Sequence, residues 1–154
     1  MINPAHNIWM KPQENDYFCG EACLQYASAK LLRENVSQGM IGHLARVTPN
    51  GTSHKGLIEA ARWLKLNPIE IHDNPGEVKK YLDDNHVVII GCTWGPDAEH
   101  YSILLEMGED FVTINDQDYI PMLYIMRRED FDTAWHDTEY VRQWALVLSK
   151  EQDE

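Results

Sequence analysis

The sequence predicts an α+β fold in which N-terminal helices pack on a C-terminal antiparallel sheet. Apolar residues recur at the helical spacings of three and four over the first half of the chain, and near-continuous or alternating apolar runs follow in the second half. Helices that precede strands, instead of alternating with them, are typical of α+β domains. The chain has 154 residues. We therefore expect one domain over residues 1–150, followed by a frayed acidic tail at 151–154.

Four helices are expected before the main run of strands. The segment 2–17 contains two Pro and has no periodicity, so it is expected to be an extended loop. Ser37 and Ser53 are suitable N-caps for the second and third helices, and Pro75 suits the first turn of the fourth. The predicted helices span residues 19–35, 37–48, 54–66 and 75–85.

The strands are predicted from apolar runs and turn residues. VVIIGC at 87–92 indicates a strand that is buried on both faces. The segment 100–116 indicates a hairpin around Gly108, and Pro121 favours an edge position for the strand that contains it. The predicted strands lie at 68–72, 86–94, within 100–116 on both sides of the turn, at 119–128 and at 145–149, with a further helix over 128–144.

Charge and cysteine content exclude several classes of protein. The net charge is −12, from 13 Lys and Arg against 25 Asp and Glu, which disfavours binding to nucleic acid or to an anionic membrane. Such acidity suits solubility or a cationic partner. Three cysteines and no visible signal peptide indicate a cytoplasmic, reducing location, and no apolar run is long enough for membrane insertion. The scattered histidines and the lack of a Gly-rich phosphate loop predict no metal and no cofactor.

Cys19 is a candidate nucleophile because it opens the first predicted helix. A helix N-terminus favours a thiolate over a thiol. The adjacent Gly20 would leave room for a substrate backbone, and the side-chain amide of Gln13 could donate to an oxyanion together with the Cys19 N–H. The alternative is that Cys19 is a small buried core residue, which is our interpretation of Cys23 and Cys92.

His100 is the candidate base, since a nucleophilic cysteine needs one. If the hairpin turns at Gly108, Glu106 faces Asp110 and His100 faces Asp116. Facing side chains in an antiparallel pair lie close enough for a hydrogen bond. The alternative is a purely structural cross-strand pair.

The sequence resembles the papain-like cysteine peptidases, and within them the bacteriocin-processing family that cuts leader peptides after a Gly-Gly pair. The resemblance implies a papain-like fold, with Cys19 as nucleophile, His100 as general base and acid, Asp116 as orienting carboxylate and Gln13 as oxyanion donor. Transport-linked members precede an exporter and an ATPase, and these 154 residues contain neither, which implies a stand-alone form. The matching stretches are QENDYFCGEACL (13–24), GTSHKGLIEAARWLKL (51–66), VVIIGC (87–92), HYSILLEMGEDFVTIND (100–116) and EDFDTAWHD (129–137).

Several questions stay open at this point. Phe18 stands where transport-linked relatives usually have Asp, so the substrate could be a Gly-Gly leader, another peptide or a different amide. Hydrolysis and acyl transfer would use the same residues, and a catalytically idle peptide-binding module is a third interpretation. The aromatic residues that could line a cleft are Trp9, Tyr17, Trp63 and Trp94. Trp94 is the strongest candidate for substrate contact because it lies in the loop that leads to His100. The oligomeric state is not predicted.

Overall fold

The computed structural model describes residues 10–94, 99–116, 122–136 and 142–151. Within these ranges the helices come mainly first and the strands mainly later, as the predicted fold class requires. The helices are α1 (Cys19–Leu32), α2 (Gln38–Ala45), α3 (His54–Trp63), α4 (Pro75–Asp83) and α5 (Arg128–Ala134). The strands are β1 (Leu66–Ile71), β2 (Val87–Thr93), β3 (Glu99–Met107), β4 (Phe111–Asp116), β5 (Met122–Arg127) and β6 (Ala145–Lys150).

All six strands form one sheet in the order β1-β6-β2-β3-β4-β5, and every neighbouring pair is antiparallel. The strands from β2 to β5 follow one another as a meander. The last strand, β6, lies between β1 and β2. The predicted edge position of the strand after Asp116 is confirmed, because β5 is an edge of the sheet.

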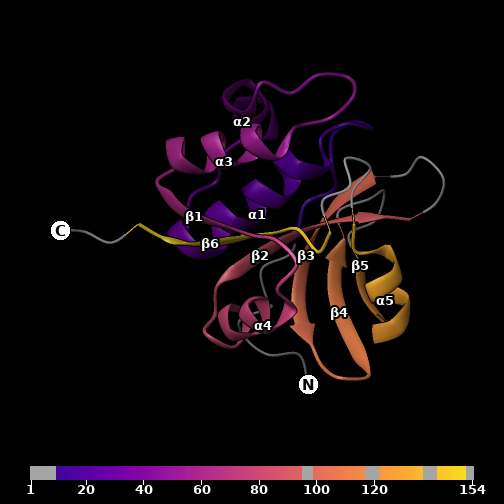
Figure 1. The fold of residues 1–154 in the computed structure, drawn as a ribbon. Helices are drawn as coiled ribbons and strands as arrows, with labels where there is room; N and C mark the ends of the chain where they lie inside the picture. The colour runs from indigo at the N-terminus through magenta and orange to yellow at the C-terminus, as the bar shows by residue number, and fades with distance from the viewer. Residues whose placement is uncertain (1–9, 95–98, 117–121, 137–141, 152–154) are drawn as a thin grey trace.

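Helices cover both faces of the sheet (Figure 1). On one face α1 packs against β2, β3 and β6, and α2 and α3 pack beside α1. On the other face α4 packs against β2, β3 and β6, and α5 packs against β4 and β5. Two buried clusters result, one on each face, and strand β2 contributes to both through alternate residues such as Ile89 and Ile90.

The helix starts follow from local capping. Ser37 accepts a hydrogen bond from the backbone N–H of Met40, and Ser53 accepts one from that of Gly56. Pro75 is the first residue of α4. These three predicted helix starts are confirmed. Each serine accepts a hydrogen bond from a first-turn N–H, and the proline has no backbone N–H that would need an acceptor.

The predicted helix over 128–144 is too long. Helix α5 ends at Ala134, and His136 forms an isolated β-bridge with Arg142 instead of continuing the helix. Trp135 is buried, and its indole N–H donates to the backbone oxygen of Trp144 at 3.0 Å. The apolar spacing in this segment therefore reflects two tryptophans that pack near each other across a bend. Part of the predicted helix, 137–141, lies outside the described residues, as does Pro121.

Candidate active site

The start of β3 and the end of β4 meet at one end of the sheet, and each carries an ionisable side chain there. His100 is the second residue of β3 and Asp116 is the last residue of β4. His100 Nε2 and Asp116 Oδ1 form a hydrogen bond of 2.7 Å, with the two side chains 18% and 17% exposed. The contact predicted between these residues is therefore present.

The register predicted for this hairpin is wrong, although the contact is present. Glu106 pairs with Thr113 and not with Asp110. The backbone N–H of Gly108 donates to the oxygen of Phe111 at 2.9 Å, so the turn lies at Glu109 and Asp110 instead of being centred on Gly108. Sequence alone did not distinguish these two turns, because each places a glycine at the bend.

A bulge explains how His100 still reaches Asp116. The pairing shifts by one residue between Leu104 and Glu106, and continuing this register places Asp116 opposite Ser102. The net displacement from the predicted register is two residues, so His100 and Asp116 keep the same face of the sheet. They contact each other diagonally instead of face to face.

Cys19 is the first residue of α1, as predicted. The side chain of the N-cap residue, Phe18, makes no hydrogen bond to the first turn of the helix. The first-turn N–H groups and the positive end of the helix dipole therefore lie near the Cys19 sulfur. Cys19 is half-buried, and its side chain is hydrogen-bonded to His100. Because Asp116 occupies Nε2 of His100, the ring nitrogen that remains for Cys19 is Nδ1.

The imidazole of His100 is held in its charged form by its two partners. Burial by itself lowers the pKa of His100, but the hydrogen bonds to Asp116 and to Cys19 outweigh it and raise that pKa to about 10. An imidazolium placed between a carboxylate and a sulfur can stabilise a thiolate and later give up its proton.

The other two cysteines have a different environment. Cys23 and Cys92 are fully buried, and burial raises the pKa of both thiols. Their predicted place in the core is confirmed. None of the three cysteines forms a disulfide, and Cys19 alone among them is not buried.

Gln13 lies at the same end of the sheet, in the loop before α1. Its Nε2 donates to the backbone oxygen of Asn15 at 2.7 Å, which fixes the orientation of the amide. One N–H of Nε2 is not used by this bond. The opposite atom, Oε1, is buried and has no hydrogen-bond partner among the described residues.

Sequence reasoning missed the residue that holds this loop in place. Gln38, the first residue of α2, is buried and donates to the backbone oxygen of Pro12 at 2.9 Å and to Gln25 Oε1 at 3.0 Å. Its own oxygen accepts from the N–H of Glu14 at 3.0 Å. Gln38 therefore contacts the backbone on both sides of Gln13. A glutamine next to a helix cap carried no sequence signal for this role.

Two clefts lie on either side of His100 in the described part of the chain. The larger, of about 510 Å³, is lined by residues of the loop before α1 and of β3, β4 and β5, and it includes Gln13, Trp94 and Asp116. The smaller, of about 370 Å³, includes Cys19 and the segment from Arg46 to His54. Glu99 and His100 line both clefts, so the candidate reacting groups lie at the boundary between them.

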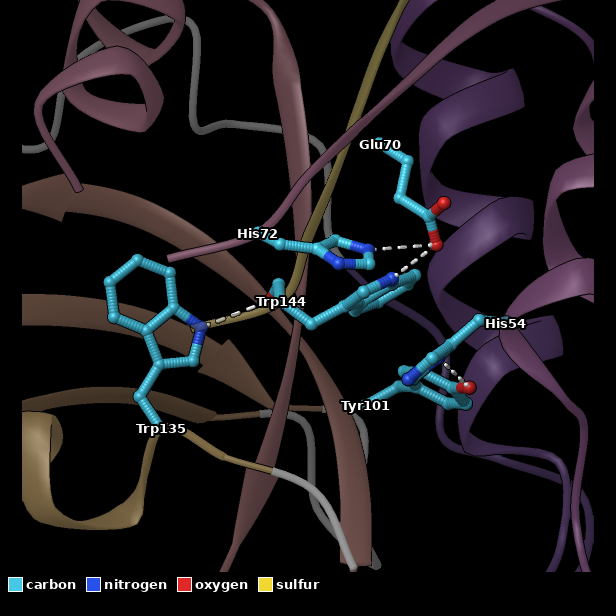
Figure 2. A network of polar contacts seen from close by, with 6 residues as sticks. All are labelled: His54, Glu70, His72, Tyr101, Trp135 and Trp144. Carbon is cyan, nitrogen blue, oxygen red and sulfur yellow. Dashed lines mark hydrogen bonds and ion pairs between the residues drawn. The ribbon is translucent and has the colours of Figure 1, made fainter. Parts of the chain in front are cut away.

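A chain of polar and stacking contacts supports the smaller cleft (Figure 2). The Tyr101 hydroxyl donates to the backbone oxygen of Thr52 at 2.9 Å, so the contact of 2.7 Å between that hydroxyl and His54 Nδ1 has the histidine as donor. The His54 ring stacks on Trp144 with ring centroids 3.9 Å apart. The indole N–H of Trp144 donates to Glu70 Oε2 at 2.7 Å. These contacts connect the cleft wall to β1, to β3 and to the residue that precedes β6.

Glu21 is a second residue that sequence reasoning missed. It is fully buried in the first turn of α1, and both of its oxygens accept from the Thr52 hydroxyl, at 2.5 and 2.8 Å. Burial raises the pKa of Glu21, and the Thr52 hydrogen bond partly offsets this rise. Gly51, with φ of 104°, provides the left-handed turn that brings Thr52 to this position. A glutamate among apolar neighbours in CGEACL was the available signal.

The two predicted substrate-binding residues, Gly20 and Trp94, lie in different environments: Gly20 is packed inside the protein, and Trp94 lines a cleft. A Cβ on Gly20 would lie 2.8 Å from Leu57 Cδ2 and 3.2 Å from Tyr101 Cδ2, so packing inside the protein already requires glycine there. Trp94 is 38% exposed and lines the larger cleft together with His100. By contrast Trp63 is 73% exposed on α3 and lines neither cleft. Trp9 lies outside the described residues.

Within the described ranges, no three His, Cys, Asp or Glu side chains are grouped so that they could hold a metal ion. Over the same residues, no helix is both long enough and apolar enough to cross a membrane.

Helices on an antiparallel sheet, with a cysteine at a helix start beside a histidine and an aspartate, are the arrangement of a cysteine peptidase. The family model of the peptidase C39 family matches residues 7–143. The chain belongs to the peptidase C39 family and is a cysteine peptidase. A comparison with curated proteins found no match.

Solved structures share the fold. The peptidase domain of Streptococcus ComA, a bifunctional ABC transporter of a quorum sensing pathway, is 23% identical with a TM-score of 0.78, covering 94% of this chain and 99% of that one. A double glycine motif protease from an AMS/PCAT transporter, solved with its leader peptide, is 19% identical with a TM-score of 0.70, covering 97% and 99%. A putative C39-like peptidase from Bacillus anthracis is 15% identical with a TM-score of 0.75, covering 96% of each chain. The predicted papain-like fold, resembling the bacteriocin-processing peptidases, is thus confirmed.

Proposed function

We propose that this chain cleaves peptide bonds with Cys19 as nucleophile, His100 as general base and acid, Asp116 as the carboxylate that orients His100, and Gln13 as an oxyanion donor. The observation that carries the proposal is that His100 is hydrogen-bonded to both Cys19 and Asp116. Covalent acyl transfer requires a nucleophile in contact with a base, and a third group that orients the base. Cys19, His100 and Asp116 have this arrangement.

The reaction follows from these contacts. The Cys19 sulfur attacks the substrate carbonyl carbon, and the oxyanion accepts hydrogen bonds from the Cys19 backbone N–H and the Gln13 side chain. The C–N bond then breaks as His100 gives its proton to the leaving amine. A water molecule, deprotonated by His100, attacks the acyl-enzyme. The C–S bond then breaks, the carboxylic acid leaves, and Cys19 and His100 return to their starting protonation.

We further propose that the substrate is a leader peptide cut after a Gly-Gly pair. A relative of the same fold was solved with a leader peptide and is described as a double glycine motif protease. The cleft that contains Cys19 has a volume of about 370 Å³, which lies in the range of ordinary ligand clefts. Three cysteines without a disulfide fit a reducing cytoplasm as the site of action.

Alkylation and cleavage assays test this proposal together. Iodoacetamide labelling, read by mass spectrometry, should modify Cys19 rapidly at pH 5–6, and His100→Ala should abolish this rapid reaction while Cys23→Ala leaves it intact. A synthetic peptide with an internal Gly-Gly pair should be cut by the native chain and not by Cys19→Ser. Reaction of Cys19 only near pH ~8.5, without cleavage, would instead identify an idle peptide-binding module. Repeating the assay with an added amine or thiol separates hydrolysis from acyl transfer.

A further inference from the structure

The larger cleft lies on the side of the site from which the leaving amine departs. His100 lines both clefts, but Cys19 lines only the smaller one. In the proposed reaction the acyl group stays on Cys19, and the amine takes its proton from His100. The smaller cleft therefore holds the acyl side of the substrate, and the larger cleft receives the residue just after the cut.

The larger cleft is acidic and partly aromatic. Asp16 and Glu99 are exposed residues on its lining, Glu99 at its border with the smaller cleft, which it also lines, and Asp116 lies deeper beside His100. Trp94 and Tyr124, which are 38% and 41% exposed, also line it. Among the described lining residues none is Lys or Arg. Carboxylates beside exposed aromatic faces form a suitable environment for an ammonium or guanidinium group.

Two buried polar atoms in the same cleft have no partner. Ser102 is 1% exposed, and its hydroxyl oxygen makes no hydrogen bond among the described residues. It lies on the same face of β3 as His100, two residues further along the strand. Gln13 Oε1 is likewise buried without a partner. Unpaired buried polar atoms are unfavourable, and both atoms can accept hydrogen bonds, so a ligand rich in N–H donors would complement them.

We propose that this cleft is a specificity subsite for a Lys or Arg side chain at the first substrate position after the cut, with Asp16 and Glu99 as the residues that determine the preference. The inference rests on the proposed peptidase function and adds a requirement on the leaving side of the substrate. The net charge of −12 acts in the same direction, because it raises the local concentration of cationic peptides.

Three peptides test the subsite directly. They share one sequence up to and including Gly-Gly and differ only in the next residue, which is Lys, Gln or Glu. For the native chain kcat/KM should fall in the order Lys, Gln, Glu, with roughly a tenfold ratio between Lys and Glu, as expected for partly exposed charge pairs that add to a cation–π contact. Equal kcat/KM values would overturn the subsite and leave the proposed function standing.

Charge-removing variants identify the residues responsible. Asp16→Asn and Glu99→Gln should each lower the Lys-to-Glu ratio by about threefold. Glu109→Gln, which removes the same charge at the far turn of the β3–β4 hairpin, should leave the ratio unchanged. If Glu109→Gln lowered the Lys-to-Glu ratio equally, the preference would come from the overall charge of the protein. That result would overturn the assignment of Asp16 and Glu99.

A binding measurement keeps the two proposals distinguishable. The Cys19→Ala variant cannot form an acyl-enzyme, so fluorescence anisotropy reports the affinity of each peptide without cleavage. If this variant binds in the order Lys, Gln, Glu while the native chain cuts none of them, the subsite stands and the proposed hydrolysis fails. Equal affinity, or no binding, for the three peptides overturns the subsite.

Discussion

At the scale of single residues, His100 links every step of the proposed reaction. It contacts the nucleophile through one ring nitrogen and Asp116 through the other. Because both partners stabilise the imidazolium, His100 keeps its proton through neutral pH while it faces the Cys19 sulfur. An imidazolium beside the sulfur can stabilise the negative charge that the sulfur carries when it attacks the substrate.

The raised pKa of His100 predicts a pH-dependent stability. The ordinary histidine pKa of about 6.5 applies to the unfolded chain, and the folded value is about 10. The stabilisation is therefore complete below pH ~6.5 and is lost as pH rises through ~10. Asp116→Asn removes the carboxylate partner and should lower the free energy of unfolding by about 1–3 kcal/mol at pH 6, with a smaller difference at pH 10.

Urea unfolding at pH 6, 8 and 10 measures this difference. Asp110→Asn, an exposed acidic residue in the β3–β4 turn, is the matched control and should show little effect at any pH. A deficit in Asp116→Asn that stays constant across the range would show that the charge of His100 does not contribute.

Gly20 gives a prediction about packing. Because an added Cβ would lie 2.8 Å from Leu57, Gly20→Ala should lower the free energy of unfolding by about 1–3 kcal/mol, as overpacked core positions do. Gly39→Ala is the control, since nothing lies within 4 Å of a Cβ on that exposed helical residue, and it should stabilise the chain by up to about 1 kcal/mol. Thermal unfolding of both variants measures these changes. If Gly20→Ala were as stable as the native chain, Leu57 would be able to move aside.

At the scale of elements, the loop before α1 depends on α2. Gln38 bridges Pro12 and Glu14, so Gln38→Leu should leave these backbone groups unpaired, at a cost of about 1–3 kcal/mol in stability. The same change should reduce kcat more than it raises KM, because it displaces the proposed oxyanion donor Gln13. Met40→Ala, an exposed residue of the same helix, is the control. If Gln38→Leu were destabilised but kept its kcat, the position of the loop before α1 would not affect catalysis.

Elements with a strong local signal could be predicted from sequence. Serine caps, a first-turn proline and a doubly buried apolar run set the starts of α2, α3 and α4 and the position of β2, because these signals depend on neighbours in the chain. The bend after Ala134 could not be predicted, since it depends on Trp135 and Trp144 packing near each other.

In the candidate site, too, local features could be predicted from sequence and long-range contacts could not. The face shared by His100 and Asp116 follows from the two-residue periodicity of a strand, so it survived an error of two residues in register. The bulge near Leu105, the Gln38 bridge and the Glu21–Thr52 contact join segments far apart in sequence. No local pattern in the sequence indicates such pairings. The single-domain boundary and the catalytic roles remain predictions.

At the scale of the whole molecule, Glu70 connects β1 to the wall of the active-site cleft through Trp144 (Figure 2). Burial alone would raise the pKa of Glu70, but the Trp144 hydrogen bond and the nearby His72 and His54 lower it overall. A lowered pKa contributes stability above the unfolded value of about 4.3, and this contribution is lost as pH falls through the folded value.

Glu70→Gln tests this contribution because it removes the charge and keeps an acceptor for the indole. At pH 7 it should destabilise the chain by less than about 1 kcal/mol, since the Glu70 side chain is 37% exposed. At pH 3 the difference should vanish. Thermal unfolding at both pH values measures it, with the exposed Glu106→Gln as control. If Glu70→Gln lost more stability at pH 3 than at pH 7, the charge of Glu70 would not stabilise the fold.

The position of β6 has a consequence for how the chain is made. This strand leaves the ribosome after the other five, yet it fills the place between β1 and β2, and its residues from Ala145 to Leu148 are completely buried. Until it emerges, β1 has no partner, and the apolar strand β2 keeps an open edge that can pair with other chains. The β2–β5 meander can form early, but the sheet is completed only by its most distant contact. Newly made chains should therefore be most prone to aggregation after β2 has emerged and before β6 follows it.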